Sequence, residues 1–224
     1  MNTESRFPLI GDPAPAFRAM TTQGKINFPE DYRGKWVVLF SHPADFTPVC
    51  TTEFIAFASL AEEFAKRNTQ LVGLSIDSLH SHLAWLKSIE SIDLNGQGSV
   101  SIPFPVIADI SMSVAKKYGM LQTVANTQTV RAVFIIDAEG IVRTVLYYPM
   151  CTGRNMQEIL RIVDSLQMHD SEAVSTPANW QPGDKVILGA PLTQEELTER
   201  LENAPEDVEV LTWYLAFKKL KEDK

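Results

Sequence analysis

Cysteine is scarce in this chain, and its scarcity limits the chemistry that the protein can perform. Only two of the 224 residues are cysteines, Cys50 and Cys151, and they lie far apart in the sequence. Two widely separated cysteines do not make a disulfide framework, and without a C-x-x-C sequence a thioredoxin-type disulfide oxidoreductase is disfavoured. A reducing compartment is the default for such a chain, and there an isolated cysteine is free to be catalytic. We therefore expect a cytoplasmic protein.

Basic residues and long apolar runs are lacking as well. Lys and Arg number 20 against 28 Asp and Glu, which gives a formal net charge of −8. This acidity disfavours broad binding to nucleic acid or to an anionic membrane. No apolar run approaches the ~20 residues that cross a bilayer. The N-terminus, MNTESRFPLIGDPAPAF, has no basic flank followed by an apolar core, so we expect no secretory signal.

What remains is an ordinary globular composition, 45% hydrophobic and 21% charged. It suits one large domain, or one domain with an appendage. An unbroken apolar run predicts a strand at 36–40, and apolar-rich runs predict further strands at 70–76, 105–108, 129–136 and 141–148, the last two as a hairpin around 137–140. Apolar residues at helical spacing predict helices over 51–66, 80–88, 111–118 and 155–166. With a hairpin expected over 17–27, this order predicts an α/β fold with a mixed sheet.

The composition changes after Met168. Residues 171–182 are polar and contain prolines, as in a linker, and 185–188 predicts a short strand. Thr193 and Glu196 form a capping-box pattern ahead of a helix. The tail, 211–224, mixes aromatic and aliphatic residues with lysines. So small a segment cannot form its own core, so we expect it to pack on its own chain or on a partner; the alternative is an exposed amphipathic tail.

Cys50 stands in the most informative stretch, SHPADFTPVCTTEF, between a predicted strand and a predicted helix. Thr47 suits the N-cap of that helix and Pro48 its first position, which places Cys50 in the first turn. Backbone N–H groups and the helix dipole there favour thiolate over thiol. The alternative is a buried cysteine packed as a small hydrophobe. The cap, together with His42 and Asp45, argues against a dry core position.

The same stretch resembles a known active site. Pro43, Thr47 and Cys50 stand as P-x-x-x-T-x-x-C, and the wider sequence resembles the peroxiredoxins, in particular their one-cysteine subfamily with a C-terminal extension. The resemblance covers nearly the whole chain. It implies a thioredoxin-like fold with a mixed central sheet, a peroxidase domain over residues 1–170 and a C-terminal dimerisation extension over 171–224. It also implies a homodimer or a larger ring of dimers, with the extension reaching toward the partner subunit's active site.

The activity implied is that of a thiol-dependent peroxidase in antioxidant defence. Hydrogen peroxide and organic hydroperoxides would be reduced through a Cys50 sulfenic acid, which an external thiol then reduces. A cation is required beside the sulfur, and Arg131 is the main candidate, because charged residues in buried strands are rare unless paired. Its strand resembles the one whose arginine contacts the catalytic sulfur in the family. Arg154 matches the subfamily and could orient Glu53 or Arg131; the alternative is a surface arginine.

The other candidates have narrower roles. The hydroxyl of Thr47, one helical turn before Cys50, can reach the thiolate or a peroxide oxygen, besides capping the helix. Pro43 carries no donor and is expected to shape the loop and shield the sulfur from water. His42 could hydrogen-bond peroxide or the surroundings of the sulfur, although lone histidines are more often structural. Glu53 is expected to pair with an arginine across the first turn.

Some features point away from other chemistries. His80, His82 and His169 show no metal spacing with either cysteine, so we predict no metal site and no cofactor. The region YRGKWVV lacks the serine of the G-x-S-x-G stretch that some subfamily members carry, so no phospholipase activity is inferred. Cys151 is not required by the family pattern, and we expect an incidental, partly buried thiol. Alternative functions are a cysteine hydrolase using His42, a peroxide sensor and an oligomeric holdase chaperone.

Overall fold

The computed structural model describes residues 7–96, 98–121 and 128–220, which fall into two compact units. The N-terminal unit ends at Met156, and the C-terminal unit begins at Gln157. The division lies at the start of helix α5 (Met156–Glu172), whereas the boundary predicted from the sequence, after residue 170, lies near the end of that helix. The assignment of a peroxidase domain and a dimerisation extension stays a prediction.

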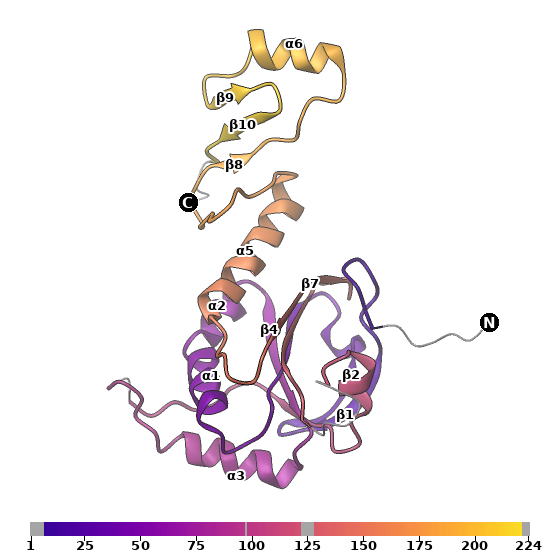
Figure 1. Cartoon of the computed structure of the whole chain (residues 1–224), viewed down its shortest axis with the longest axis vertical. Coiled ribbons are helices and arrows are strands. Elements are labelled where there is room, and N and C mark those ends of the chain that lie inside the picture. Colours follow the sequence, from indigo (N-terminus) through magenta and orange to yellow (C-terminus); the bar gives the residue numbers. More distant parts are fainter. Residues whose placement is uncertain (1–6, 97, 122–127, 221–224) are drawn as a thin grey trace, which may run out of the picture. The chain divides into compact units, whose positions relative to one another are not determined.

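A seven-stranded mixed sheet forms the centre of the N-terminal unit (Figure 1), which confirms the predicted α/β class. Its order is β2-β1-β5-β4-β3-β6-β7, with β3, β4 and β5 parallel and the remaining neighbours antiparallel. The strands are β1 (Phe17–Thr21), β2 (Gly24–Phe28), β3 (Trp36–Ser41), β4 (Thr69–Ser75), β5 (Val106–Ala108), β6 (Arg131–Ile136) and β7 (Val142–Tyr148). Each strand predicted in this unit is confirmed, and two of them, β3 and β6, are buried along their whole length as central strands are.

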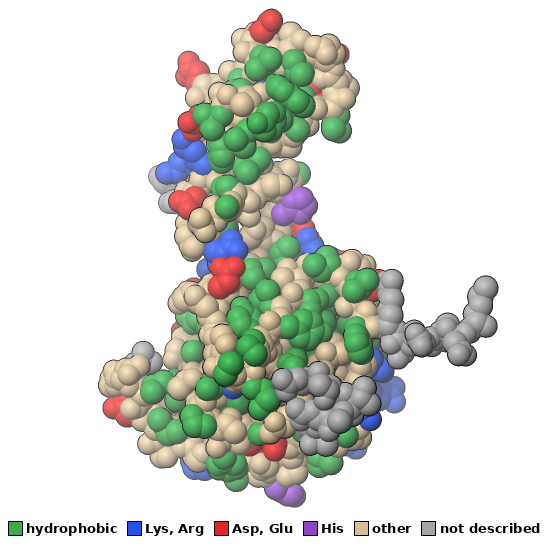
Figure 2. All heavy atoms as spheres, viewed as in Figure 1, with side chains coloured by type: hydrophobic (Ala, Val, Ile, Leu, Met, Phe, Trp, Pro, Cys, Tyr) green, Lys and Arg blue, Asp and Glu red, His purple; other side chains and the backbone are tan. Residues whose placement is uncertain are grey.

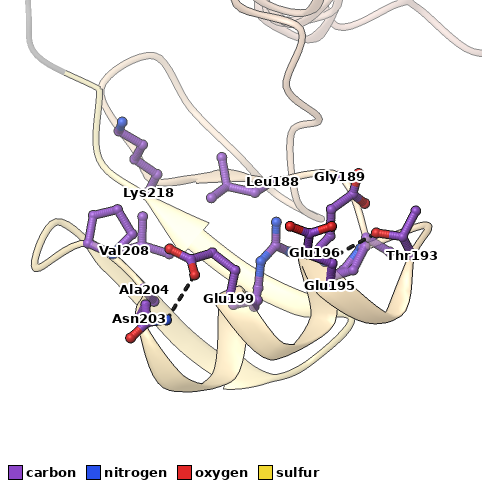
Figure 3. A pocket seen from close by; sticks show the side chains of 14 residues that line it. Leu188, Gly189, Thr193, Glu195, Glu196, Glu199, Asn203, Ala204, Val208 and Lys218 are labelled. Atoms are coloured by element: carbon purple, nitrogen blue, oxygen red, sulfur yellow. Dashed lines mark hydrogen bonds between the residues drawn. The ribbon is translucent and has the colours of Figure 1, made fainter.

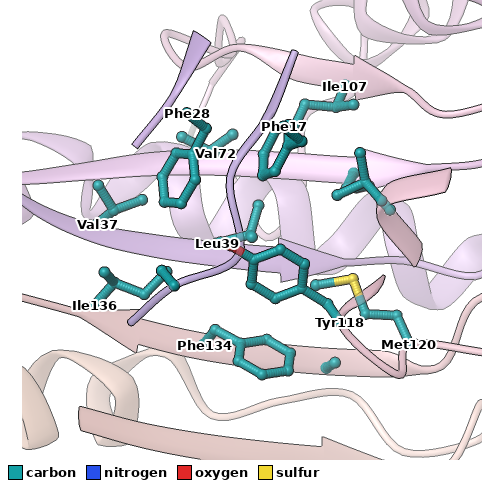
Figure 4. Packing of buried hydrophobic residues seen from close by; sticks show 14 of the residues in the cluster. Phe17, Phe28, Val37, Leu39, Val72, Ile107, Tyr118, Met120, Phe134 and Ile136 are labelled. Atoms are coloured by element: carbon teal, nitrogen blue, oxygen red, sulfur yellow. The ribbon is translucent and has the colours of Figure 1, made fainter. Parts of the chain in front are cut away.

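β3 is buried along its whole length, and its two faces belong to different parts of the core. Val37 and Leu39 point into a cluster with residues from β1, β2 and β6 (Figure 4). Phe40 points to the other face, where its ring stacks on Phe57 of helix α1 (Pro48–Ser59) at 4.2 Å. Alternation along the strand therefore holds the sheet between two apolar layers.

The aromatic layer under α1 determines how closely that helix approaches the sheet. Phe54 of α1 meets the ring of Phe40 edge to face at 5.6 Å. Gly73 of β4 makes this fit, because a Cβ there would lie 3.3 Å from Phe40 and 3.4 Å from Phe54. A side chain at that position would require the rings of Phe40 and Phe54 to shift by a few tenths of an ångström.

The helices follow the predicted periodicity with one correction. The predicted helix 51–66 is two helices, α1 and α2 (Ala61–Lys66), separated at Leu60, whose φ of −104° and ψ of 3° leave the helical region. Nothing in the local sequence, neither glycine nor proline, explains this break. The other helices of this unit and its boundary are η1 (Glu30–Tyr32), α3 (Leu79–Ile89), α4 (Ser113–Lys117) and α5. No helix in the described part of the chain is long and apolar enough to cross a membrane.

The C-terminal unit contains a three-stranded antiparallel sheet, ordered β8-β10-β9, and one helix, α6 (Gln194–Glu202) (Figure 1). The strands are β8 (Val186–Ile187), β9 (Val208–Thr212) and β10 (Leu215–Lys218). Thr193 caps α6 by accepting from the N–H of Glu196, as predicted. The expectation that the tail over 211–224 packs on its own chain is confirmed up to residue 220, because β10 pairs with β9 and β8, and the alternative of an exposed amphipathic tail is wrong there; residues 221–224 lie outside the described part.

Candidate active site

Cys50 occupies the first turn of α1, as the sequence predicts. Thr47 is the N-cap in an extended conformation, and Pro48 is the first helical residue. Cys50 therefore lies at the end of the helix where the first backbone N–H groups have no partner within the helix. The prediction that polar neighbours keep Cys50 out of the core is wrong. Cys50 is 0% exposed, and His42 and Asp45 are buried with it. A charged group at this position must therefore find its partners within the protein.

Arg131 supplies a cation to the buried sulfur. It is the first residue of β6, next to β3, and only 3% of it is exposed. Its Nη1 donates to Cys50 Sγ at 3.2 Å and to Glu53 Oε2 at 2.7 Å. Its Nε and Nη2 both donate to the carbonyl of Met150, at 3.0 and 2.8 Å. Every nitrogen of the guanidinium thus has a partner, and one of them is directed at the sulfur.

Glu53 joins Arg131 to the second arginine, Arg154. The Oε1 atom of Glu53 accepts from the backbone N–H and the Nε of Arg154, at 2.8 and 2.9 Å, and Oε2 accepts from Nη2 at 2.7 Å. Arg154 Nη1 donates to the carbonyls of Ser41 and Ala132. Arg154 is therefore buried, not a surface arginine. Glu53 pairs with two arginines, which extends the single pairing expected from the sequence.

The electrostatics of this cluster are set by its burial and its pairing. Burial alone would raise the pKa of Glu53, but the hydrogen bonds and charge of Arg154, with the charge of Arg131, outweigh burial and lower it. Glu53 is therefore ionised at neutral pH. The guanidinium of Arg154 also lies over the rings of Phe40 and Phe57, at 5.3 and 5.7 Å. One carboxylate against two guanidiniums leaves net positive charge beside the sulfur of Cys50.

Thr47 makes a different hydrogen bond from the one expected. Its side chain does not cap α1; instead its Oγ1 donates to the carbonyl of Ala44 at 2.9 Å. Because the hydroxyl hydrogen is used there, the oxygen's lone pairs are left to accept a hydrogen bond. A hydroperoxide O–H is a suitable donor. Thr47 thus offers a hydrogen-bond acceptor within one helical turn of Cys50. Its hydroxyl donates to Ala44 and not to the sulfur of Cys50.

Pro43 and His42 lie in the buried part of the loop between β3 and α1. Nε2 of His42 lies 2.9 Å from Oδ1 of Asp45, and the ring meets Phe54 edge to face at 4.8 Å. Burial lowers the pKa of His42 despite the opposing effect of Asp45, so the ring is neutral at pH 7. The structure brings His42 into the polar surroundings of the active-site loop, and its proposed contact with peroxide stays a prediction.

His82 is the residue that the sequence interpretation missed. It lies on α3 and is fully buried, with Nδ1 2.8 Å from Oδ2 of Asp45. A signal was available, because His82, Trp85 and Ile89 recur at the spacing of one buried helix face. Among the described residues, His42, Asp45 and His82 form a group close enough to hold a metal ion. Their contacts of 2.8 to 3.0 Å are hydrogen-bond distances, shorter than the roughly 3.3 Å between ligands of a tetrahedral zinc.

Cys151 lies close to Arg154 in the sequence, but it is not part of the buried cluster of Arg131, Glu53 and Arg154. The residue is exposed, which corrects the expectation of partial burial, and its Sγ lies 3.7 Å from the hydroxyl of Thr152. Its neighbour Met150 accepts two hydrogen bonds from Arg131. The chain on either side of Cys151 is therefore tied to the active site, while the thiol itself faces solvent.

A cavity of about 870 Å³ lies in the C-terminal unit, between α6 and the small sheet (Figure 3). Glu195, Glu196 and Glu199 line it together with Arg200 and Lys218, and it contains none of the candidate site residues. The buried cysteine and its paired charges, in the other unit, carry the chemistry.

Sequence comparison places the chain in a known family. The AhpC/TSA family matches residues 10–145, and the C-terminal domain of 1-Cys peroxiredoxin matches residues 165–204. The chain is 61% identical over 215 residues to a peroxiredoxin of Methanosarcina mazei, covering 95% of this chain and 98% of that protein. It is 52% identical over 225 residues to a peroxiredoxin of Aquifex aeolicus, covering 96% and 98%.

Solved structures agree. A yeast mitochondrial 1-Cys peroxiredoxin superposes with a TM-score of 0.82 at 41% identity, covering 95% of this chain and 99% of the other. A cysteine-to-serine mutant of peroxiredoxin 6 from Arenicola marina gives 0.82 at 36% identity, covering 96% and 99%. The mixed α/β sheet of this chain agrees with the thioredoxin-like fold of these relatives. The chain therefore belongs to the AhpC/TSA family, in its one-cysteine peroxiredoxin branch with a C-terminal extension, and is a thiol-dependent peroxidase.

Proposed function

We propose that Cys50 is the nucleophile that reduces the hydroperoxide and that Arg131 activates it. The observation that carries this assignment is the 3.2 Å contact between Arg131 Nη1 and Cys50 Sγ in a fully buried setting. A guanidinium cannot lose its proton in a protein, so it stabilises the thiolate at any physiological pH. The same cation faces the oxygen on which negative charge develops as the O–O bond breaks.

The first half-reaction balances with one proton. The Cys50 thiolate attacks one oxygen of the hydroperoxide, an S–O bond forms, and the O–O bond breaks. The electron pair leaves with the distal oxygen, which takes a proton and departs as water or an alcohol, while Cys50 becomes a sulfenic acid. Thr47 accepts a hydrogen bond from the hydroperoxide O–H. Pro43 and His42 belong to the loop that faces the reacting oxygens.

The second half-reaction uses an external thiol. A thiol attacks the sulfenic sulfur, releases water and forms a mixed disulfide, and a second thiol returns Cys50 to the reduced state. The yeast relative is described as resolved via glutathione/thioredoxin systems. We propose a reductant of the same kind here, one that needs no second cysteine of this chain. Two free thiols are typical of a reducing compartment, and we propose the cytoplasm.

Peroxide consumption with dithiothreitol as the reductant tests the assignment of Cys50. Cys50→Ser removes the thiolate but changes the side-chain volume little, so we expect turnover to be abolished with the fold retained by circular dichroism. Wild-type turnover near zero would favour a peroxide sensor or a holdase, which consume no peroxide catalytically. Turnover that survives in a folded Cys50→Ser protein would overturn the assignment.

We also propose that the protein assembles at least as a homodimer through its C-terminal unit. This unit leaves large apolar side chains exposed, among them Leu192 at 91% and Leu211 at 58%. Exposed apolar groups gathered in one small unit favour a protein partner. The larger ring of dimers is an extension of the same proposal.

A further inference from the structure

His82 has two hydrogen-bond partners, and both of them are acceptors. Its Nδ1 lies 2.8 and 3.0 Å from the two carboxylate oxygens of Asp45, and its Nε2 lies 3.1 Å from the backbone carbonyl of Ile107 in β5. The side chain is 0% exposed, so water does not supply an alternative partner. A carbonyl oxygen can only accept hydrogen bonds, and the same is true of an ionised carboxylate.

Asp45 is ionised. Burial alone would raise its pKa, but the hydrogen bonds from His42 and His82 outweigh burial and hold the pKa of Asp45 far below its ordinary value. Both nitrogens of His82 therefore face acceptors, which is the arrangement of a ring that donates from both nitrogens beside a buried carboxylate. Asp77 is the other acidic group here; its Oδ2 accepts from the backbone N–H of Asp45 and from Ser75, so it fixes the loop and not the rings.

His42 contacts the same carboxylate as His82, but only one of its two ring nitrogens has a hydrogen-bond partner. Its Nε2 donates to Oδ1 of Asp45, and its Nδ1 is buried without a hydrogen-bond partner. Burial lowers the pKa of His42, and the charge of His82 acts in the same direction, so the ring is neutral at pH 7. Nδ1 of His42 is thus an unprotonated acceptor held in a dry setting. A buried polar atom without a partner is costly and usually marks a functional position.

We propose that His82 is a positioning residue for the peroxidase reaction, which acts through Asp45 to keep His42 in the Nε2–H tautomer with Nδ1 as a hydrogen-bond acceptor. The proposal rests on the proposed function, in which the loop of His42 faces the reacting oxygens. The same clamp holds the loop backbone, because Ala44, next to Asp45, accepts the hydroxyl of Thr47. Losing His82 would therefore disturb both acceptors offered to the substrate O–H.

NMR of the wild-type full chain tests the protonation states directly. The chain has four histidines, so long-range proton–nitrogen correlations of protein labelled with ¹⁵N-histidine are assigned from the signal lost in each glutamine variant. At neutral pH we expect His82 to carry protons on both nitrogens and His42 on Nε2 alone. If His82→Gln does not fold, the other three assignments identify its signals by elimination. A singly protonated His82, or His42 protonated on Nδ1, would overturn the proposal.

Kinetics separate positioning from a purely structural role. We expect His82→Gln to slow the oxidation of Cys50 by peroxide about tenfold, the effect of losing one hydrogen-bonded contact. His82 is one of the groups that lower the pKa of His42, so its replacement raises that pKa and the acid limb of the pH–rate profile should move to higher pH. His80→Gln is the matched control, since His80 is exposed on the same helix.

The failures of the two proposals differ. Turnover retained by Cys50→Ser would remove the proposed function, and the role of His82 with it. If Cys50→Ser is inactive while a folded His82→Gln keeps the wild-type rate and the same acid limb, only the inference on His82 fails. A slower His82→Gln with an unmoved acid limb would indicate a structural residue and likewise overturn the inference.

Discussion

At the scale of single residues, the site works because each buried charge has a partner that cannot move away. One guanidinium nitrogen of Arg131 donates to both Cys50 and Glu53. Arg154 supplies the other donors to the carboxylate of Glu53. Taking such groups out of water is costly unless geometry and hydrogen bonding are good. In the proposed mechanism the sulfur faces one preorganised donor, Nη1 of Arg131, which need not rearrange when charge shifts to the peroxide oxygens.

Thr47 offers a test of the acceptor role at this scale. Thr47→Val removes the oxygen, whereas Thr47→Ser keeps it beside the Ala44 carbonyl. We expect the valine variant to react with peroxide at least about tenfold more slowly than the serine variant, because one hydrogen bond to substrate is lost. Stopped-flow fluorescence of Cys50 oxidation measures both rates. Equal rates would leave Thr47 with a role in loop structure alone.

Cys151 bears on the number of cysteines in the mechanism. Cys50 is buried in a helical turn and Cys151 is exposed, so their thiols lie in different environments, whereas a disulfide needs Cα atoms within about 7 Å and Cβ atoms that face each other. We expect Cys151→Ser to keep near-normal turnover with dithiothreitol. Mass spectrometry after one equivalent of peroxide should detect a Cys50 sulfenic acid. A dominant Cys50–Cys151 crosslink would instead make this a two-cysteine enzyme.

At the scale of elements, Glu53 is what joins helix α1 to the rest of the site. From α1 it reaches Arg131 at the start of β6 and Arg154 just before α5. Trp85 of α3 adds a second tie, because its Nε1 donates to the hydroxyl of Thr51. The first turn of α1 is therefore held from three directions, which restricts the motion of Cys50.

Glu53→Gln should lower the free energy of unfolding, because it removes the ion pairs of Glu53 with Arg131 and Arg154. A neutral amide leaves two buried guanidiniums without a counter-charge, which costs about 3–5 kcal/mol at pH 7. Because the pKa of Glu53 is lowered in the folded state, its contribution is complete above the ordinary value of 4.5 and is lost as the pH falls below it. Urea unfolding should thus show a difference between wild type and variant that narrows below about pH 4.5.

Glu63→Gln on α2 serves as the control. Glu63 is only partly buried, with 40% of its side chain exposed, and it pairs with Lys66 and Arg67, so its replacement should change stability little. A Glu53→Gln protein as stable as this control at pH 7 would contradict the view that Glu53 holds the site together.

At the scale of the whole molecule, the two units differ in how they satisfy their apolar surface. The N-terminal unit encloses a continuous apolar cluster from β1 to β7. In the small C-terminal sheet, hydrophobic side chains gather on the face shown in Figure 2, and Trp213 and Tyr214 remain 45% and 55% exposed. These two rings meet edge to face at 5.4 Å and present one aromatic surface.

This surface predicts a measurable effect on association. Replacing both rings, in Trp213→Ala with Tyr214→Ala, should weaken self-association, because large aromatic groups dominate the energetics of protein interfaces. Analytical ultracentrifugation over a concentration series measures the change. Ile110→Ala is the control, since Ile110 is comparably exposed, at 63%, but lies in the N-terminal unit. An assembly that is unchanged in the double variant would refute the interface proposed for the C-terminal unit.

The sequence by itself determined the elements and the reactive turn. Apolar runs that are buried on both faces, such as that of β3, can only be central strands, and a Thr-Pro pair ahead of Cys50 defines a helix start from neighbouring residues alone. Arg131 could also be found, because a charge at the head of an apolar strand needs a partner. Each of these inferences depends on residues close together in the chain.

Only the tertiary structure decided how distant residues combine. It buried Cys50 completely, paired Glu53 with two arginines far from it in sequence, and turned the hydroxyl of Thr47 toward Ala44. It also brought His82 from α3 onto Asp45, a pairing that no local pattern predicts. The physical reason is that hydrogen bonds and burial depend on how β3, α1, α3 and β6 pack, and packing is a property of the whole fold.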